Sequence, residues 1–457
     1  MVPAKPLQKR KTMKDILVLG AGLSTQSLIE YLLENAAAYD WHITVADVNE
    51  ELARKKVNGS SRGKAVVFDI TDDLESWRTI AKADIVISML PAFMHHLVAK
   101  KCIDLRKPML TASYVTEEIK EYDELAKKAK VPILMELGVD PGIDHMSAMR
   151  VINRIKNMGG ELLSFNSFTG GLVAPESDNN PWNYKLTWNP RNVVLAGNGV
   201  SQFIQQGRYK YIPYFRLFDR MMTRKILDYG DFEICANRDS LSYREIYGLK
   251  DIPSMFRGTI RRPGFAKAWD VFVKLGATDD TYTMEDSENM TYRDFINSFM
   301  RYEPNVPVEI KLQEYCENAA DPVVFEKLKW LGIFDKRKVG LKNATPAQIL
   351  QKLLEEKWAM DPDDKDLLIM QHEFKYRLGN EKKMIISAMA VIGENRERTA
   401  MAKTVGLPLG IATKLLATGK INKTGIHRPV DKDMYEPILK ELEDFGIGFK
   451  EKEYLID

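Results

Sequence analysis

Two glycines near the start of the chain have the spacing of a phosphate-binding turn. In VLGAGLSTQS, residues 18–27, Gly20 and Gly22 occupy the first two glycine positions of the dinucleotide fingerprint G-x-G-x-x-G, and Thr25 occupies the third. Gly20 permits the tight turn, and Gly22 lets a phosphate approach the backbone because no Cβ intervenes. The third glycine mainly allows close packing of a helix on a strand, so a small residue can replace it. The turn therefore predicts a dinucleotide site.

An acid follows the next apolar segment. Asp47 ends HITVAD, and an acid at the end of the second strand accepts hydrogen bonds from the ribose and repels a 2′-phosphate. We therefore expect NAD rather than NADP. Arg54 and Lys55, a helical turn or two further on, keep NADP as the less favoured alternative. A capping role at the helix that begins near Glu50 is the alternative for Asp47.

These residues need a sheet whose strands end at one edge. Short apolar segments alternate with helical patterns through the first third of the chain, which predicts a Rossmann-type, doubly wound parallel sheet. We expect its strands at residues 15–20, 42–47, 65–69, 84–90, 108–112 and 132–137. We expect helices at residues 24–35, 50–56, 74–81, 93–102 and 116–129, the last capped by Thr116. Because ligands bind at the carboxyl ends of such strands, Leu90, Ser113 and Tyr114 are placed in the cleft. Ordinary loop residues that cap the next helix are the alternative for Ser113 and Tyr114.

The pattern changes after Val139. A turn and helix at 140–155 precede a half-exposed strand at 162–171, and further strands are expected at 185–196 and 231–240. Amphipathic helices then run from 265 to 360, and two long strands flank Gly379-Asn380 as a hairpin. A helix at 401–419 and a charged helix near 435–445 close the chain. This order indicates a mixed α/β domain interrupted by an all-helical insertion.

Composition excludes several classes of protein. The 457 residues carry a formal net charge of +2, which gives no reason to expect nucleic acid or an anionic membrane as a partner. Cys102, Cys235 and Cys316 lie far apart, which argues for a reducing, cytoplasmic location and against a disulfide framework. No apolar run has membrane-spanning length, and residues 1–12 are basic without a signal core, so we expect a disordered tail there, with a clipped or degenerate organelle-targeting segment as the less favoured alternative. No cluster has metal-site spacing, and His95-His96 are expected on a helix surface.

Longer segments resemble one family, the glutamate-forming saccharopine dehydrogenases (saccharopine reductases), from about Asp15 to the C-terminus. The resemblance is carried by TASYV, ELGVDPGIDHM, TGGLVAPESDNNPWNYKLTWNPRNV, NRDS followed by YREIYGL, FRGTIRRPGF and MAKTVGLP. It implies a homodimer and a three-domain fold whose C-terminal segment returns to the nucleotide domain. The expected domains are a nucleotide domain at 1–137 and 400–457, a substrate-binding and dimerisation domain at 138–258 and 362–399, and a helical insertion at 259–361.

The resemblance also implies site residues. The family's cofactor contacts carry over to Leu23, Ser24, Thr25, Gln26, Asp69, Ile70, Leu90, Thr111, Ala112, Val139, Asp140, Pro141 and Asn189. Its substrate contacts carry over to Ser113, Tyr114, Asp140, Arg216, Asn237, Arg238 and Asp239. Two departures stand out. Val48 follows Asp47 where NADP-using members place an arginine, which agrees with NAD, and Thr169 replaces a cysteine before Gly170-Gly171, so no thiol is required there.

The implied activity is the NAD(P)-dependent oxidation of saccharopine to glutamate and 2-aminoadipate 6-semialdehyde, or the reverse condensation, in lysine metabolism. Saccharopine bears several carboxylates, which the planar fork of arginine binds with paired hydrogen bonds. Arg238 is the first candidate, and its alternative is an ion pair with Asp239 or Glu233. The other candidate anchors are Arg216, Arg257, Arg261 and Arg262.

Proton transfers must accompany amine deprotonation and imine hydrolysis. Asp140 is the leading candidate to hold the amine or the attacking water, and Tyr114 and His145 are lesser ones. A turn-forming role for Asp140 without proton transfer is an equally favoured alternative. Two other functions stay open: a related imine reductase such as carboxynorspermidine dehydrogenase, and a non-catalytic dinucleotide-binding scaffold or sensor.

Overall fold

The computed structural model describes residues 13–196 and 198–457. Contacts divide the chain into two units: the first holds the residues up to Arg150 and Ala402–Gly446, and the second holds Val151–Met401 and Ile447–Asp457. Helices α7 (Ile143–Asn157) and α15 (Ala400–Ala417) each cross a division between the units. The basic segment 1–12, which the sequence predicts to be a disordered tail, lies outside the described residues.

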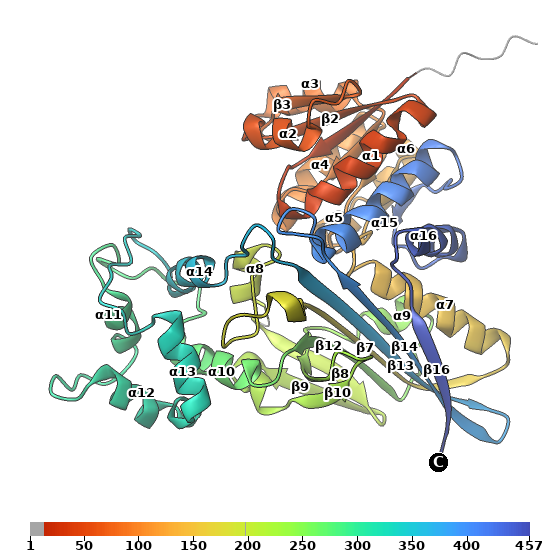
Figure 1. The fold of residues 1–457 in the computed structure, drawn as a ribbon. Helices are drawn as coiled ribbons and strands as arrows, with labels where there is room; N and C mark the ends of the chain where they lie inside the picture. Colours follow the sequence, from red (N-terminus) through yellow and green to blue (C-terminus); the bar gives the residue numbers. More distant parts are fainter. Residues whose placement is uncertain (1–12, 197) are drawn as a thin grey trace, which may run out of the picture. The chain divides into compact units, whose positions relative to one another are not determined.

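The first unit contains a seven-stranded sheet in the order β15-β6-β5-β4-β1-β2-β3. Figure 1 labels two of these strands, β2 and β3, and the helices around them. Its strands are β1 (Lys14–Leu19), β2 (Trp41–Asp47), β3 (Gly63–Val67), β4 (Ile85–Ser88), β5 (Met109–Leu110), β6 (Pro132–Leu134) and β15 (Gly425–His427). Every pair is parallel, and Ile16 of the central β1 is in register with Ile43 and Ile85. The predicted doubly wound parallel sheet is confirmed, with β15 as a further strand from the C-terminal part of the chain.

Helices connect these strands, as the alternation predicts. They are α1 (Gln26–Tyr39), α2 (Glu50–Val57), α3 (Asp73–Lys82), α4 (His95–Asp104), α5 (Glu117–Lys120) and α6 (Asp123–Ala129), and α16 (Lys432–Asp444) follows the last strand, β15. The one helix expected at 116–129 is two helices, and Thr116 caps the first by accepting the Ile119 N–H. Helix α15 packs closely on α1 at Gly406. A Cβ at this position would lie only 2.6 Å from the Leu28 backbone nitrogen, so glycine allows the close approach.

The second unit is built on a nine-stranded sheet in the order β10-β11-β12-β7-β13-β14-β16, with β8 paired to β12 and β9 paired to β8. Its strands are β7 (Glu161–Val173), β8 (Val200–Gln205), β9 (Arg208–Pro213), β10 (Met222–Lys225), β11 (Asp231–Ala236), β12 (Ser254–Arg261), β13 (Asp366–Leu378), β14 (Glu381–Ile392) and β16 (Lys450–Ile456). The β12–β7 pair is parallel and the others are antiparallel, so this is a mixed sheet, and the predicted α/β domain is confirmed. Leu378 pairs with Glu381 across the predicted Gly379-Asn380 turn.

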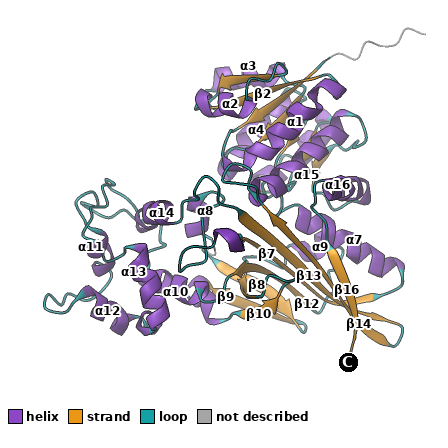
Figure 2. Ribbon diagram, in the orientation of Figure 1, coloured by secondary structure: helices purple, strands orange, loops and turns teal. Residues whose placement is uncertain are grey.

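The helices of the second unit are α8 (Pro190–Val194), α9 (Tyr243–Ile246), α10 (Phe265–Leu275), α11 (Tyr292–Asn297), α12 (Val308–Tyr315), α13 (Pro322–Leu331) and α14 (Pro346–Lys357). Figure 2 shows α10 to α14 gathered beside the strands, apart from α9. The core of α10 to α14 includes Trp269 and Trp358, together with Trp182 and Tyr184 from outside the predicted insertion. The contacts therefore leave the predicted insertion, residues 259–361, within the second unit.

Residues 138–150, expected in the substrate-binding domain, belong to the first unit. Two other segments also differ from the expectation. Residues 185–196 do not form a strand, because Asn189 caps α8 and Pro190 occupies its first turn. Residues 447–457 belong to the second unit, since β16 pairs with β14 along Lys382 to Ala388. The β16 sequence is strongly charged, so its apolar pattern is too weak to reveal a strand. Among the described helices, none combines the length and apolar character that crossing a membrane requires.

Candidate active site

The glycine turn has the form that the fingerprint predicts. Gly20 follows β1 with φ of +102°, and a Cβ there would lie 2.9 Å from the Met89 carbonyl oxygen, so a side chain does not fit. A Cβ on Gly22 would meet no atom within 4 Å, which leaves that side of the turn open to a ligand. Leu23–Thr25 form a 3₁₀ turn before α1. The backbone therefore presents an open, glycine-lined helix start.

Thr25 occupies the third glycine position, and its buried hydroxyl has a hydrogen-bond partner. Its side chain is buried, and its hydroxyl donates to the Gly22 carbonyl oxygen at 2.8 Å. Within the described residues no side chain caps the start of this 3₁₀ turn or of α1, whereas Asn49 and Asp72 cap α2 and α3. The N–H groups and positive dipole end at α1 therefore fit a pyrophosphate.

Asp47 supports the turn through both carboxylate oxygens. Oδ2 accepts the Ala21 N–H at 2.7 Å, and Oδ1 accepts the Asn49 N–H at 2.9 Å. The cap of α2 is Asn49, which accepts from Glu51 and Leu52, so the capping alternative for Asp47 is wrong. Both carboxylate oxygens of Asp47 thus already have backbone donors.

The positive side chains beside this turn belong to α2. Arg54 forms an exposed ion pair with Glu50, and Lys56 donates to the Gln26 side chain at 2.7 Å. Val48, which directly follows β2, is 70% exposed. Arg54, Lys55 and Lys56 thus place positive charge on α2, the helix that follows β2.

The other predicted cofactor contacts of the first unit follow its strands. Asp69 accepts hydrogen bonds from the Thr71 N–H and hydroxyl, and the hydroxyl bond is the main reason that its pKa is lowered. Leu90, after β4, is partly buried against the apolar core. Thr111 is buried after β5, and Ala112 follows it half-buried. These positions lie at the carboxyl ends of parallel strands, which meet at one edge of the sheet.

His95 is a functional candidate that the sequence misplaced. It is 1% exposed, so the expectation of a surface residue is wrong. Its Nδ1 is 2.8 Å from the Ser88 hydroxyl and its Nε2 is 2.7 Å from the Ser113 hydroxyl. Burial, with a smaller effect of His96, lowers the pKa of His95 to about 4. A neutral imidazole therefore holds the Ser113 side chain at physiological pH.

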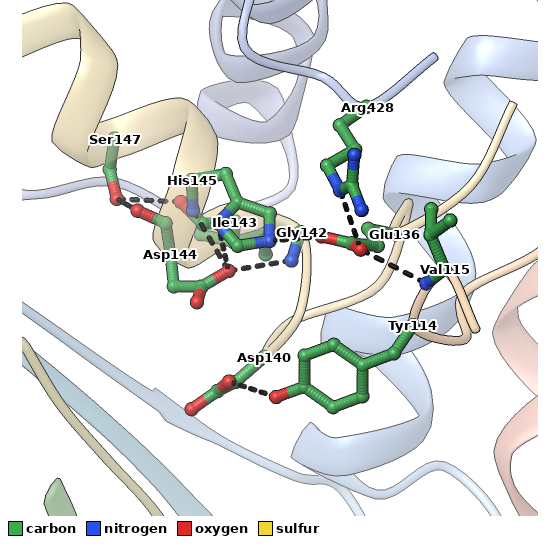
Figure 3. A network of polar contacts seen from close by, with 10 residues as sticks. All are labelled: Tyr114, Val115, Glu136, Asp140, Gly142, Ile143, Asp144, His145, Ser147 and Arg428. Atoms are coloured by element: carbon green, nitrogen blue, oxygen red, sulfur yellow. Dashed lines mark hydrogen bonds and ion pairs between the residues drawn. The ribbon is translucent and has the colours of Figure 1, made fainter. Parts of the chain in front are cut away.

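Two predicted catalytic side chains meet directly. Figure 3 shows the Tyr114 hydroxyl pointing at Asp140, to whose Oδ1 it donates at 2.9 Å. Tyr114 follows β5 and is 36% exposed, while Asp140 is half-buried in the turn before α7. We call these two residues the Tyr–Asp pair. An acceptor and a donor in contact at a partly exposed edge suit proton transfer to a bound ligand.

The turn that carries Asp140 is closed by backbone hydrogen bonds. The Gly138 N–H donates to the Pro141 carbonyl, and the Ile143 N–H donates back to the Gly138 carbonyl. Val139 and Pro141, two predicted cofactor contacts, are buried in this turn. The turn-forming role considered for Asp140 therefore falls largely on its neighbours, and its own carboxylate is directed at Tyr114.

Behind the Tyr–Asp pair lies a buried charged network that the sequence did not indicate (Figure 3). Glu136, 1% exposed, accepts from Arg428 Nε at 2.8 Å and lies 2.8 Å from His145 Nε2. Burial alone would raise the pKa of Glu136, but His145 and Arg428 lower it to about 2. The carboxyl group is therefore charged throughout the physiological range.

The predicted anchors belong to the second unit. Asn237, Arg238 and Asp239 follow β11 in one loop, where Asp239 accepts the Leu241 N–H at 2.7 Å. Arg238 is exposed, and across the described part of the chain it has no ion pair with Asp239 or Glu233, which does not support that alternative.

The remaining candidate arginines have partners within the second unit. Arg216, by contrast with Arg238, pairs with Asp219 in an exposed turn. The guanidinium groups of Arg257, Arg261 and Arg262 lie over aromatic rings and act in packing. Asn189, the predicted cofactor contact in this unit, caps α8 with its side chain.

In residues 13–196 and 198–457 no group of three or more His, Cys, Asp or Glu side chains could hold a metal ion. Cys102, Cys235 and Cys316 are buried and free.

Comparison with known proteins gives a consistent result. Residues 16–134 match the family model of the saccharopine dehydrogenase NADP binding domain, and residues 138–447 match that of the saccharopine dehydrogenase C-terminal domain. The saccharopine dehydrogenase (NADP(+), L-glutamate-forming) of Schizosaccharomyces pombe is 30% identical over 96% of this chain and 99% of its own. Its counterpart from Pyricularia oryzae is 31% identical with the same coverage.

A solved structure agrees with these matches. The apo saccharopine dehydrogenase (L-Glu forming) of Saccharomyces cerevisiae superimposes with a TM-score of 0.87 and 28% identity, over 96% of this chain and 100% of that one. The alpha-aminoadipic semialdehyde synthase of Arabidopsis thaliana is 31% identical over 99% of this chain but only 46% of its own length. The chain thus spans about half the length of the curated synthases that it matches.

The expected cofactor, NAD, is contradicted by these comparisons. The matching nucleotide domain is described as NADP binding, and the fungal relatives are named for NADP(+). The physical basis for NAD was an Asp47 carboxylate directed at the ribose, but both of its oxygens accept backbone N–H groups of this chain. An acid that accepts backbone N–H groups of the turn does not indicate whether the cofactor ribose carries a 2′-phosphate. The matches over nearly the whole chain, together with the glycine turn and the Tyr–Asp pair, establish that this chain belongs to the saccharopine dehydrogenase family.

Proposed function

We propose that the chain is an NADP⁺-dependent saccharopine dehydrogenase of the glutamate-forming type. It oxidises saccharopine to an imine that water splits into glutamate and 2-aminoadipate 6-semialdehyde, or it runs the reverse condensation. Fungal relatives that bear this name align over 99% of their own length, which supports the proposal. The observation that carries it is the contact between Tyr114 and Asp140, at 2.9 Å, in the unit that also holds the glycine turn.

The first unit supplies the cofactor site. The open side of Gly22 and the uncapped start of α1 bind the pyrophosphate, and Asp47 keeps the turn in place by accepting the Ala21 N–H. Arg54 and Lys55 on α2 provide the positive charge that a 2′-phosphate requires. Bound NADP⁺ supplies the hydride acceptor. Asp69, Ile70, Leu90, Thr111 and Ala112 line the same edge of the sheet.

The Tyr–Asp pair handles protons. In the oxidative direction, the Asp140 carboxylate takes the proton of the substrate's secondary amine or orients the water that attacks the imine. The Tyr114 hydroxyl donates to Asp140, which holds the carboxylate in one orientation and stabilises its charge. His95, neutral because burial lowers its pKa to about 4, orients the Ser113 hydroxyl toward the substrate.

The second unit supplies the anchors for the substrate carboxylates. Arg238 is exposed, and among the described residues it makes no ion pair, so its guanidinium can bind a carboxylate with two hydrogen bonds. Asn237 and Asp239 flank it in the same loop, and Arg216 is a second anchor once it leaves Asp219. A homodimer and a cytoplasmic location also belong to the proposal, and they rest on the family resemblance and on the free thiols.

The test is turnover by the purified full chain. We expect saccharopine to reduce NADP⁺ faster than NAD at equal concentration, with glutamate identified by mass spectrometry. Carboxynorspermidine is the matched alternative substrate and should not be turned over. Turnover of carboxynorspermidine alone would replace the proposal by the related imine reductase. Binding of NADPH without any saccharopine-dependent change in absorbance would identify a scaffold instead.

A further inference from the structure

Glu136 is a buried charge in a strained backbone conformation. It follows β6 with φ of +59°, in the left-handed region that residues with a side chain rarely adopt. Its side chain is 1% exposed. Such strain persists only where the surroundings over-determine the conformation, and it concentrates at functional sites. The contacts of Glu136 identify which part of the site it serves.

Glu136 binds both chain neighbours of Tyr114. Its backbone N–H donates to the Ser113 carbonyl at 3.1 Å, and its Oε1 accepts the Val115 N–H at 3.0 Å. One residue thus fixes the peptide groups on either side of Tyr114. The Tyr114 side chain is attached to the backbone between these two hydrogen-bonded peptide groups. The two hydrogen bonds therefore determine where the Tyr114 hydroxyl lies.

The same carboxylate reaches the turn that carries Asp140. Its Oε2 lies 2.8 Å from His145 Nε2, in the first turn of α7. The neighbouring Asp144 accepts the His145 N–H at 2.8 Å and the Gly142 N–H at 2.6 Å, which ties His145 to the turn (Figure 3). Glu136 therefore stands between the two segments that present the Tyr–Asp pair.

Arg428 keeps this arrangement charged and compact. It lies just after β15, in the part of the first unit contributed by the C-terminal half of the chain, and its Nε donates to Glu136 Oε1 at 2.8 Å. His145 and Arg428 overcome the effect of burial and hold the pKa of Glu136 near 2. The carboxylate can therefore accept all these hydrogen bonds at any pH at which the enzyme works.

We propose that Glu136 is a positioning residue for the reaction, which sets the distance and orientation of the Tyr–Asp pair through Val115, Ser113 and His145. The inference rests on the proposed function, because it concerns the proton chemistry of that pair. Glu136 touches neither reacting atom and acts through these neighbours alone. Its loss should therefore reduce the rate of the chemical step and leave cofactor binding intact.

The experiment compares Glu136→Gln with a matched control in the same unit, Glu441→Gln. Glu441 on α16 is also a partly buried carboxylate that contacts a cation, Lys414, and a hydroxyl, that of Tyr31. Both changes remove one negative charge and keep the side-chain shape. We expect Glu136→Gln to lower kcat for saccharopine by about 10- to 100-fold, as small misplacements of reacting groups do. The KM for NADP⁺ should be unchanged, and the pH profile of kcat should shift. Glu441→Gln should keep the wild-type kcat and pH profile.

Two Arg428 variants keep the test decisive if Glu136→Gln does not fold. Arg428→Lys retains the positive charge and should keep most of the activity, whereas Arg428→Met should reproduce the loss in kcat. Wild-type kcat and an unchanged pH profile in folded Glu136→Gln, or equal activity of the two Arg428 variants, would overturn the inference. If wild-type protein itself does not turn over saccharopine, the proposed function fails, and that outcome is distinct from a failure confined to the variants.

Discussion

Replacing Asp47 with alanine separates two roles for this acid. If Asp47 supports the glycine turn, the variant loses the acceptor of the Ala21 and Asn49 N–H groups, at 2.7 and 2.9 Å. Each hydrogen bond to a carboxylate stabilises a structure by at least about 1.5 kcal/mol. Losing both therefore destabilises the ordered conformation of the turn by roughly 3 kcal/mol. Binding must then restore the turn, which raises the Kd by up to about 150-fold. Because the pyrophosphate is common to both cofactors, we expect similar losses for NADPH and NADH.

Titration of nicotinamide fluorescence measures both dissociation constants. Asp47→Asn keeps one acceptor oxygen and should fall between wild type and Asp47→Ala. Thr345→Ala, which removes the capping hydrogen bond of α14 in the second unit, is the control for a general loss of stability and should bind both cofactors normally. A large loss for NADH with an unchanged or improved affinity for NADPH would refute the reasoning, because it would place the carboxylate on the ribose.

Three further predictions concern the turn, a buried acid and the substrate. Gly142→Ala should reduce kcat by at least about 100-fold, since φ is +145° and a Cβ would overlap the Gly138 carbonyl oxygen, and stopped-flow turnover measures this. Burial raises the pKa of Asp366 to about 6. The protonated carboxyl group therefore stabilises the folded state fully below the unfolded pKa near 4, and this stabilisation is lost as the pH rises through 6. The loss is about 3 kcal/mol, and Asp366→Asn should remove this pH dependence in urea unfolding at pH 4 and pH 7. Arg238→Ala should raise the KM for saccharopine and leave the Kd for NADPH unchanged, and a raised Kd for NADPH or an unfolded variant would contradict its role as an anchor.

Local patterns predicted the parts of the fold whose determinants lie close together in the sequence. The strands of the first unit are continuous apolar segments, and the hairpin at Gly379-Asn380 has a turn dipeptide between long apolar strands, so both were found. Residues 185–196 misled the prediction because Val193 and Val194 favour strands, while Asn189 and Pro190 start a short helix. The strand β16 is held by its pairing with β14, which no local pattern in a charged segment reveals.

The residues of the candidate site also fall into those that local sequence patterns predict and those that they do not. Gly20 and Gly22 are predictable because backbone geometry selects glycine, and the Tyr–Asp pair came from the resemblance and from strand-end logic. Glu136 and Arg428 contact each other across 292 positions, and such a pair leaves no trace in spacing. The cofactor prediction was wrong because the sequence does not show that both Asp47 carboxylate oxygens accept backbone N–H groups.

The most direct measurement of the central claim is a crystal structure of the chain with NADP⁺ and saccharopine bound. We expect the secondary amine of saccharopine to lie within hydrogen-bond distance of the Asp140 carboxylate, with Tyr114 still in contact with Asp140 and Arg238 on a substrate carboxylate. A structure in which the amine is held elsewhere, and Asp140 faces neither the amine nor a water beside it, would contradict the account.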